Sequence, residues 1–167
     1  MSHVNFLYHI VCGTKDRKPL IDPDWESRLF GYLGRIINNA NGKLIEINGI
    51  EDHVHLLARL GPAIAFADFM RELKADSSGF IRREFEPKFR WQRRYGAFTV
   101  SESAVQPVRR YIRNQKIHHQ GQSFDDEYKM LLKLNNIDFD EDISGTETGF
   151  DCLAPSVWNT RTYVSTT

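Results

Sequence analysis

The sequence predicts an α+β fold in which a four-stranded antiparallel sheet carries helices on one face, followed by C-terminal helices and an irregular tail. Segments with strand-like and helix-like patterns follow one another in the order β-α-β-β-α-β. A short connection joins the two middle strands as a hairpin. The chain has 167 residues, 41% of them hydrophobic, and can bury the core of one domain without disulfides or a metal ion.

The N-terminal strand and helix follow from local patterns. Residues 4–11 are rich in β-branched and aromatic side chains, which favour a strand. In the helix that follows, Asp22 is the candidate N-cap and Pro23 suits the first helical position. From Trp25 onward, apolar residues recur at three- and four-residue spacings, as on the buried face of a helix. This helix should end near residues 41–42, because Asn and Gly both accept the left-handed conformation that closes helices.

The other three strands and the second helix complete the sheet. Residues 43–48 alternate apolar and polar side chains, and residues 53–58 form their hairpin partner. A helix over about residues 66–85 ends before Pro87, and residues 96–101 give the fourth strand. This is the order of the ferredoxin-like, or split βαβ, fold. The same fold serves RNA-recognition modules and many unrelated enzymes, so it does not determine the function.

The C-terminal region adds two helices and a tail. Apolar spacing predicts one helix from about residue 105 to residue 115, with Pro107 in its first turn, and a short one over residues 124–134. Residues 135–167 are acidic, rich in Ser, Thr and Gly, and weakly patterned. We therefore expect one domain over residues 1–134 and an acidic, weakly structured C-terminal tail over residues 135–167.

Charge is unevenly distributed along the chain, although the net charge is zero. Residues 1–120 carry a net charge of +6 and residues 121–167 carry −6. A basic body with an acidic tail is compatible with nucleic-acid binding, although two ordinary solvated faces would give the same division.

The two cysteines and the apolar segments indicate a compartment. Cys12 and Cys152 lie at opposite ends of the sequence, which favours a reducing environment over a disulfide scaffold. The sequence shows neither a signal peptide nor an apolar run long enough to span a membrane. We expect a cytoplasmic protein without a membrane partner.

The segment His53-Val54-His55 is the sharpest local signal of chemistry. Residues i and i+2 of a strand point to the same face, so both imidazoles project together. Two neutral imidazoles side by side can bind one divalent ion at ~2.0–2.2 Å. Such a pair also occurs by chance in unrelated sheets, and it leaves most of a coordination sphere empty.

A second candidate pair is Tyr111 with Gln115. Four residues apart on a helix, they would lie on the same side. The tyrosine could act as a nucleophile toward phosphorus, and the amide oxygen could complete a metal site. The ordinary alternative is a tyrosine that packs in the core beside a surface glutamine.

Basic residues form two candidate nucleic-acid contacts. The first cluster is interleaved with the aromatic residues Phe85, Phe89, Trp91 and Tyr95, and it consists of Arg82, Arg83, Lys88, Arg90, Arg93 and Arg94. Arginines contact phosphates, and aromatic faces stack on unpaired bases at ~1–3 kcal/mol each. A solvated helix end with its aromatic residues in the core explains the pattern equally well. The second cluster flanks Tyr111 and consists of Arg109, Arg110 and Arg113.

Four sequence blocks together resemble a known family. They are YHIVCGTKDR at residues 8–17, DHVHLL at 52–57, LKADSS at 73–78 and YIRNQ at 111–115. These look like the successive signature blocks of IS200/IS605-type transposases, the HUH single-tyrosine (Y1) enzymes that include the REP-associated tyrosine transposases. The resemblance covers about residues 4–120 and leaves the acidic tail outside.

The resemblance implies a role for each matching residue. His53 and His55 match the two HUH histidines, which bind a divalent metal, usually Mg²⁺ or Mn²⁺. Gln115 matches the third metal ligand, and Tyr111 matches the nucleophile. The implied activity is that of a metal-dependent transposase, which cleaves and rejoins single-stranded DNA at hairpin-bearing ends through a 5′-phosphotyrosine intermediate.

The resemblance leaves the oligomeric state open, since enzymes of this type are typically dimers while REP-associated relatives are often monomers. The predicted strand around residues 98–100 contains no Lys, Arg or Pro that would discourage pairing between sheet edges. We therefore expect a homodimer.

Two other functions are compatible with the same residues. One is a domesticated protein that binds single-stranded DNA or hairpins without transposition. The other is an RNA-binding ferredoxin-like module in which His53 and His55 are merely sheet-surface residues. The intact set of two histidines, tyrosine and glutamine argues against both. No general base stands out, since Glu51 and Asp52 are adjacent to the histidines but serve equally well as structural residues.

Overall fold

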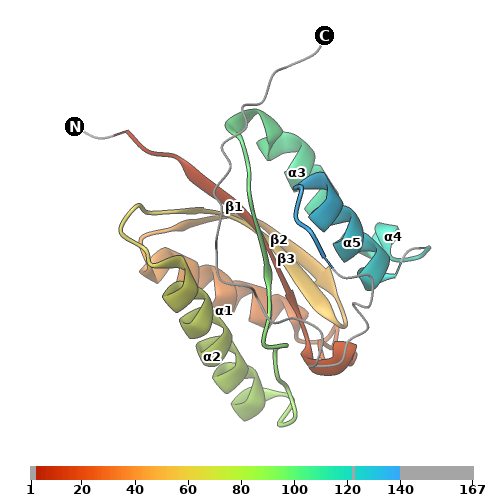
Figure 1. Ribbon diagram of the computed structural model, residues 1–167. Helices are drawn as coiled ribbons and strands as arrows, with labels where there is room; N and C mark the ends of the chain where they lie inside the picture. The colour runs from red at the N-terminus through yellow and green to blue at the C-terminus, as the bar shows by residue number, and fades with distance from the viewer. Residues whose placement is uncertain (1–2, 122, 140–167) are drawn as a thin grey trace.

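The computed structural model describes residues 3–121 and 123–139. Its sheet is antiparallel throughout, with the strand order β2-β3-β1-β4 (Figure 1). The strands are β1 (Phe6–Gly13), β2 (Lys43–Ile50), β3 (His53–Leu60) and β4 (Gly96–Thr99). The observed order confirms the predicted α+β, ferredoxin-like class.

Helices cover both faces of this sheet, as Figure 1 shows. Helices α1 (Glu26–Asn39) and α2 (Phe66–Glu84) lie on one face, as predicted. The opposite face carries α3 (Val105–Arg113), α4 (Gln115–His118) and α5 (Phe124–Leu134), and two short 3-10 turns, η1 (Lys15–Arg17) and η2 (Glu102–Ala104), complete the elements. The sequence predicted the C-terminal helices but did not assign them to a face.

Alternation along the central strands explains the two buried layers. In β1, Ile10 and Cys12 belong to the main core with α1 and α2, whereas Leu7 and Val11 pack with the C-terminal helices. Because neighbouring residues of a strand point to opposite faces, each strand supplies both cores. Only polar side chains that find partners in the protein are tolerated in such a two-sided interior. Any functional group on the inner strands is therefore covered by a helix.

The first helix begins later than predicted. Asp22 forms a turn, in which its carbonyl accepts from the backbone N–H of Trp25 at 3.1 Å and of Glu26 at 2.9 Å. Pro23 lies in this turn rather than in the helix, which starts at Glu26. The predicted end is correct, since Asn41 adopts the left-handed conformation with φ 56°.

The helix that carries Tyr111 is interrupted, contrary to the prediction of one helix through Gln115. Helix α3 ends at Arg113, and α4 begins at Gln115 after a break at Asn114. The side chain of Asn48 in β2 explains the break, because its Nδ2 donates to the carbonyl of Arg113 at 2.8 Å and satisfies the helix end. Beyond the break, Gln115 is fully buried.

The last predicted helix has the predicted bounds, Phe124–Leu134. The predicted division into a domain over residues 1–134 and a tail over residues 135–167 stays a prediction, because residues 140–167 lie outside the described part of the chain. Among the helices that are described, none has the length and apolar character that a membrane crossing requires.

Candidate active site

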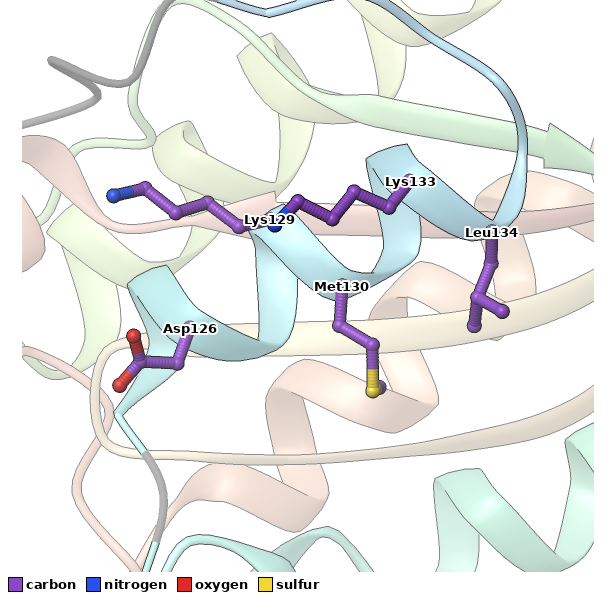
Figure 2. A pocket seen from close by; sticks show the side chains of 5 residues that line it. All are labelled: Asp126, Lys129, Met130, Lys133 and Leu134. Carbon is purple, nitrogen blue, oxygen red and sulfur yellow. The ribbon is translucent and has the colours of Figure 1, made fainter.

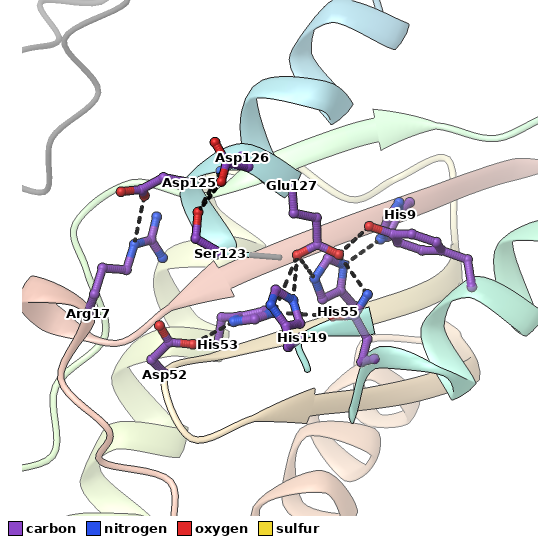
Figure 3. Close-up of polar contacts among 12 residues, drawn as sticks. His9, Arg17, Asp52, His53, His55, His119, Ser123, Asp125, Asp126 and Glu127 are labelled. Carbon is purple, nitrogen blue, oxygen red and sulfur yellow. Dashed lines mark hydrogen bonds and ion pairs between the residues drawn. The ribbon is translucent and has the colours of Figure 1, made fainter. Parts of the chain in front are cut away.

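Strand β3 places His53 and His55 on the face that α3, α4 and α5 cover, as Figure 3 shows. Both side chains are fully buried, and their ring centroids lie 5.0 Å apart. Val54 points the other way, into the core beneath α1 and α2. An interpretation of the pair as exposed residues of an RNA-binding sheet does not fit this burial.

Contacts behind the two rings orient their nitrogens. Nδ1 of His53 lies 2.6 Å from Oδ1 of Asp52, and Nδ1 of His55 lies 2.9 Å from Nε2 of His9. With hydrogen on each Nδ1, the Nε2 atoms carry the lone pairs and face inward. Burial lowers the pKa of His55 to about 4, and burial with the nearby His55 lowers the pKa of His9 to about 3. The rings of His55 and His9 are therefore neutral at neutral pH, and the neutral form is the one in which an imidazole such as that of His55 binds metal.

Glu127 of α5 lies in front of the two inward-facing nitrogens. Its side chain is 2% exposed. Its Oε2 is 3.5 Å from Nε2 of His53, 3.3 Å from Nε2 of His55 and 3.0 Å from Nε2 of His119 (Figure 3). One carboxylate oxygen thus contacts three imidazoles that come from two different parts of the chain.

Tyr111 and Gln115 reach the same carboxylate from the other side. The hydroxyl of Tyr111 donates to Oε1 of Glu127, and Nε2 of Gln115 donates to the same atom at 2.8 Å. Burial and the Glu127 carboxylate raise the pKa of Tyr111 well above its usual value, so the phenol is protonated here. The structure therefore brings Tyr111 and Gln115 beside the histidine pair despite the helix break.

The donor set fits a divalent metal ion. Two ligands that bind one ion from neighbouring positions at ~2.1 Å lie ~3.0–3.4 Å apart. Nε2 of His53 and Oε1 of Gln115 are separated by 3.2 Å. Nε2 of His55 is buried 3.3 Å from Oε2 of Glu127, and with hydrogen on Nδ1 it carries a lone pair that can bind a metal ion.

Within the described residues, one group of histidine and acidic side chains has donor atoms that all lie within 4.8 Å of one another. The group consists of His53, His119 and Glu127, and it is consistent with a divalent metal. It shares His53 with the pair chosen from the sequence, and it adds two residues that the sequence analysis missed. The missed signal in the sequence was a glutamate on the apolar side of a helix, one turn from both Phe124 and Leu131.

The first predicted DNA-binding cluster is exposed, but two of its interleaved aromatic residues are not. Phe89 and Trp91 lie in the main core, and the indole N–H of Trp91 donates to the Ser77 hydroxyl at 2.9 Å. These two rings do not stack on bases. All six basic residues of the predicted cluster are exposed, namely Arg82, Arg83, Lys88, Arg90, Arg93 and Arg94.

An open groove of about 550 Å³ runs between α2 and the segment that precedes β4. Its basic lining residues are Lys15, Arg71, Lys74, Arg82, Arg90 and Arg93. Nζ of Lys74 donates to the carbonyls of residues 92, 93 and 94 at 2.5–3.0 Å and so holds this segment. The backbone N–H of Gln92 donates at 2.8 Å to the carbonyl of Gly13, which pairs with His53 in the sheet. The segment that lines the groove is therefore hydrogen-bonded to the end of β1 that pairs with His53, while the groove itself lies on the α2 side of the sheet and the histidines lie on the other side (Figure 1).

The second predicted cluster is partly engaged within the protein. Nε of Arg109 and Nε of Arg113 lie 3.3 Å and 2.7 Å from the same oxygen of Glu46 in β2. These two ion pairs connect α3 to β2, the strand at one edge of the sheet. Arg110 is exposed. A different hollow lies on α5, where it is lined by Asp126, Lys129, Met130, Lys133 and Leu134 (Figure 2).

Comparisons with known proteins identify the class. The sequence model described as "Transposase IS200 like" matches residues 2–115. The transposase for insertion sequence element IS200 of Salmonella typhimurium is 27% identical over 118 residues, which cover 66% of this chain and 77% of that protein. The ISDra2 transposase TnpA of Deinococcus radiodurans is 29% identical over 118 residues, 65% of this chain and 82% of that protein.

Two solved structures share the fold. A crystal structure of a putative transposase from Deinococcus radiodurans has a TM-score of 0.56 and 26% identity, and it covers 68% of this chain and 93% of its own. A REP-associated tyrosine transposase bound to a REP hairpin has a TM-score of 0.56 and 13% identity, with 92% and 97% covered. The fold and these relatives define a DNA-processing enzyme of the transposase class. The chain belongs to the IS200-like transposase family, as the sequence resemblance predicted.

Proposed function

We propose that this transposase cleaves and rejoins single-stranded DNA at hairpin-bearing ends, with Tyr111 as the nucleophile. The observation that carries the proposal is the convergence of two groups on one carboxylate. The Tyr111 hydroxyl donates to one oxygen of Glu127, and Nε2 of His55 lies 3.3 Å from the other. A scissile phosphate beside this carboxylate would be within reach of both the phenol and the metal ligands.

The reaction follows from the groups that surround Tyr111. Its oxygen attacks phosphorus, a Tyr–O–P bond forms to the 5′ phosphate, and the 3′ oxygen leaves and takes up a proton as a free 3′ hydroxyl. The nearest acceptor for the phenolic proton is Oε1 of Glu127, which already holds it in a hydrogen bond. Attack by another 3′ hydroxyl reverses the step and joins strands without ATP, because the covalent link retains the phosphodiester energy.

His53, His55 and Gln115 are the residues that would hold the ion in this proposal. A bound Mg²⁺ or Mn²⁺ supplies polarisation of the scissile phosphate and stabilises the charge that develops on it. Asp52 and His9 keep the imidazoles in the required orientation through their 2.6 Å and 2.9 Å contacts.

The exposed basic residues of the groove, with Arg83, Lys88 and Arg94 beside it, supply the proposed contacts to the DNA backbone. Phosphate contacts position a strand without reading its sequence. A hairpin as the recognised element is supported by the structural neighbour that was solved with a REP hairpin.

The predicted homodimer and the cytoplasmic location belong to the proposal as well. Cys12 is a free, buried thiol, as a reducing compartment allows.

Covalent trapping tests the proposal. The protein is incubated with Mn²⁺ and single strands that carry a hairpin next to a randomised segment and a label at the 3′ end. A tyrosine that holds the 5′ phosphate retains the label on denaturing gels. Tyr111→Phe should abolish this adduct and leave binding nearly unchanged, whereas Tyr32→Phe on α1 should keep the adduct. An adduct that persists in Tyr111→Phe would contradict the assignment, and Tyr128→Phe would then test the nearest alternative.

A further inference from the structure

Helix α5 lies beyond residues 2–115, the part of the chain that matches the family, yet its buried face forms one wall of the candidate site. Phe124 packs its ring 4.4 Å from the ring of His53. The guanidinium carbon of Arg17 lies 3.5 Å from the centre of the same Phe124 ring, and Nε of Arg17 is 3.9 Å from Oδ1 of Asp125. Gly13 leaves the room that this arginine needs, because a Cβ there would meet its Nη1 at 1.8 Å. The start of α5 is thus held in place over the histidines.

Apolar packing fixes the rest of the helix. Phe124, Leu131 and Leu132 form a buried cluster with Val11 of β1 and Phe98 of β4. Glu127 projects from the same face and is as buried as its apolar neighbours. Burial of an ionised carboxylate costs several kcal/mol unless charged or hydrogen-bonded partners compensate for it. The two oxygens of the Glu127 carboxylate have different partners, and this difference indicates the role of Glu127 at the site.

Oxygen Oε1 is satisfied within the protein, since the Tyr111 hydroxyl and Nε2 of Gln115 both donate to it. Oxygen Oε2 faces three imidazole nitrogens, and of these His119 is placed to donate, at 3.0 Å. Nε2 of His55 makes no hydrogen bond although it is buried and only 3.3 Å from Oε2. Because His53 and His55 direct their δ nitrogens to Asp52 and His9, a carboxylate oxygen here faces lone pairs. A cation bound between them would turn this repulsion into attraction.

The separations between the donor atoms are close to those expected for such a shared ion. Neighbouring ligands at ~2.1 Å from one ion are ~3.0–3.4 Å apart. Oε2 of Glu127 is 3.5 Å from Nε2 of His53 and 3.3 Å from Nε2 of His55. The set His53, His55 and Gln115 offers imidazole nitrogens and an amide oxygen but no carboxylate, whereas Mg²⁺ and Mn²⁺ favour carboxylate oxygens.

We propose that Glu127 of α5 is a further ligand of the ion at the histidine site, binding through Oε2 while Oε1 holds the Tyr111 hydroxyl. This inference rests on the proposed function, because it concerns the same metal. His119 is a positioning residue, which fixes the bound oxygen by its hydrogen bond. The carboxylate then links the nucleophile to the metal through its two oxygens, and α5 becomes part of the active site.

Mn²⁺ binding without DNA tests the inference. Isothermal titration, or the loss of the electron paramagnetic resonance signal of free Mn²⁺, gives the dissociation constant for each variant. Glu127→Gln keeps the shape of the side chain and an acceptor for Tyr111, so its apparent Kd for Mn²⁺ should rise at least about tenfold. Asp126→Asn removes the neighbouring, exposed carboxylate of the same helix and should change the Kd less than about twofold. Circular dichroism without metal checks that each variant folds.

A Glu127→Gln variant that binds Mn²⁺ as tightly as the wild type, or more tightly, would overturn the inference and identify the carboxylate as an obstruction of the site. His53→Ala separates this outcome from failure of the proposed function. If His53→Ala loses Mn²⁺ while Glu127→Gln keeps it, only the role of Glu127 is wrong. If neither variant changes the affinity, the metal site itself is wrong. Should Glu127→Gln not fold, Glu127→Asp retains the charge with a shorter reach and should bind Mn²⁺ more weakly than the wild type, and unchanged binding would again count against the inference.

Discussion

The Tyr111 hydroxyl donates a hydrogen bond to Glu127, although the two residues lie 16 positions apart on different helices. This contact keeps the phenol within one chain beside the histidine pair of the same chain, since the ring centroids of Tyr111 and His55 are 5.9 Å apart. The carboxylate also favours the protonated phenol, which explains the raised pKa of Tyr111 together with burial. In the state described here, the phenol of Tyr111 lies beside the histidine pair and is protonated.

Asp52 should contribute to metal affinity through His53. Its carboxylate holds Nδ1 of His53 at 2.6 Å, and such outer contacts typically contribute about 10–100-fold to metal affinity. We expect Asp52→Asn to raise the Kd for Mn²⁺ by about tenfold in calorimetric titration, with little change in the circular dichroism spectrum. Glu51→Gln is the matched control, because its exposed carboxylate precedes Asp52 in the same turn. Equal affinities for Asp52→Asn and wild type would remove the aspartate from the metal site.

Acid should destabilise the metal-free protein. The pKa of His9 is about 3 and that of His55 about 4 in the folded state, both below the usual 6.5, mainly because of burial. The unfolded chain therefore binds more protons below about pH 6.5, and the free energy of unfolding falls as the pH drops toward 4. From pH 7 to pH 5 the loss should be on the order of 2 kcal/mol for each histidine.

Urea unfolding at pH 7 and pH 5, with a chelator present, measures this loss. His9→Gln should reduce the pH dependence by about half of the histidine contribution, because one of the two groups is removed. His3, which is exposed near the N-terminus, provides the control variant His3→Gln. A free energy of unfolding that does not change between the two pH values would show that the histidines are not neutral in the folded protein.

The groove beside α2 should determine the salt dependence of DNA binding. Arg90 and Arg93 line it and are exposed, in the segment that is hydrogen-bonded to the end of β1. Each lost phosphate contact to a single strand lowers the slope of log K against log salt by about 0.7. The double variant Arg90→Ala with Arg93→Ala should therefore lose roughly 1.4 in slope, measured by fluorescence anisotropy between low and moderate salt. Arg35 is exposed on α1 and lies outside the groove, so Arg35→Ala should retain the wild-type slope. A double variant with the wild-type slope would place the DNA elsewhere.

Local patterns in the sequence predicted most of the fold but only part of the site. The strand alternation at His53 and His55 is a property of a few adjacent residues, and it correctly places both rings on one face of the sheet. At the break near Asn114, the side chain of Asn48 donates to the carbonyl of Arg113, 65 positions away in the sequence. The apolar spacing within the helix contains no information about such a distant contact, so it could not predict the break. Glu127 joins the site through the packing of α5 on β1 and β4, which the periodicity of a single helix does not reveal.

Assembly and the placement of the nucleophile can be tested together. Strand β4 lies at one edge of the sheet, so it remains the candidate for pairing between two copies of the chain. Light scattering at micromolar concentration should give the mass of a homodimer. Because Tyr111 contacts Glu127 beside its own histidines, we expect each site to use the tyrosine of the same chain. A mixture of Tyr111→Phe and His53→Ala chains should then form no DNA adduct above the level of either variant alone. Recovery of the adduct in the mixture would instead assign the tyrosine to the partner's site, and a monomeric mass would reject pairing through β4.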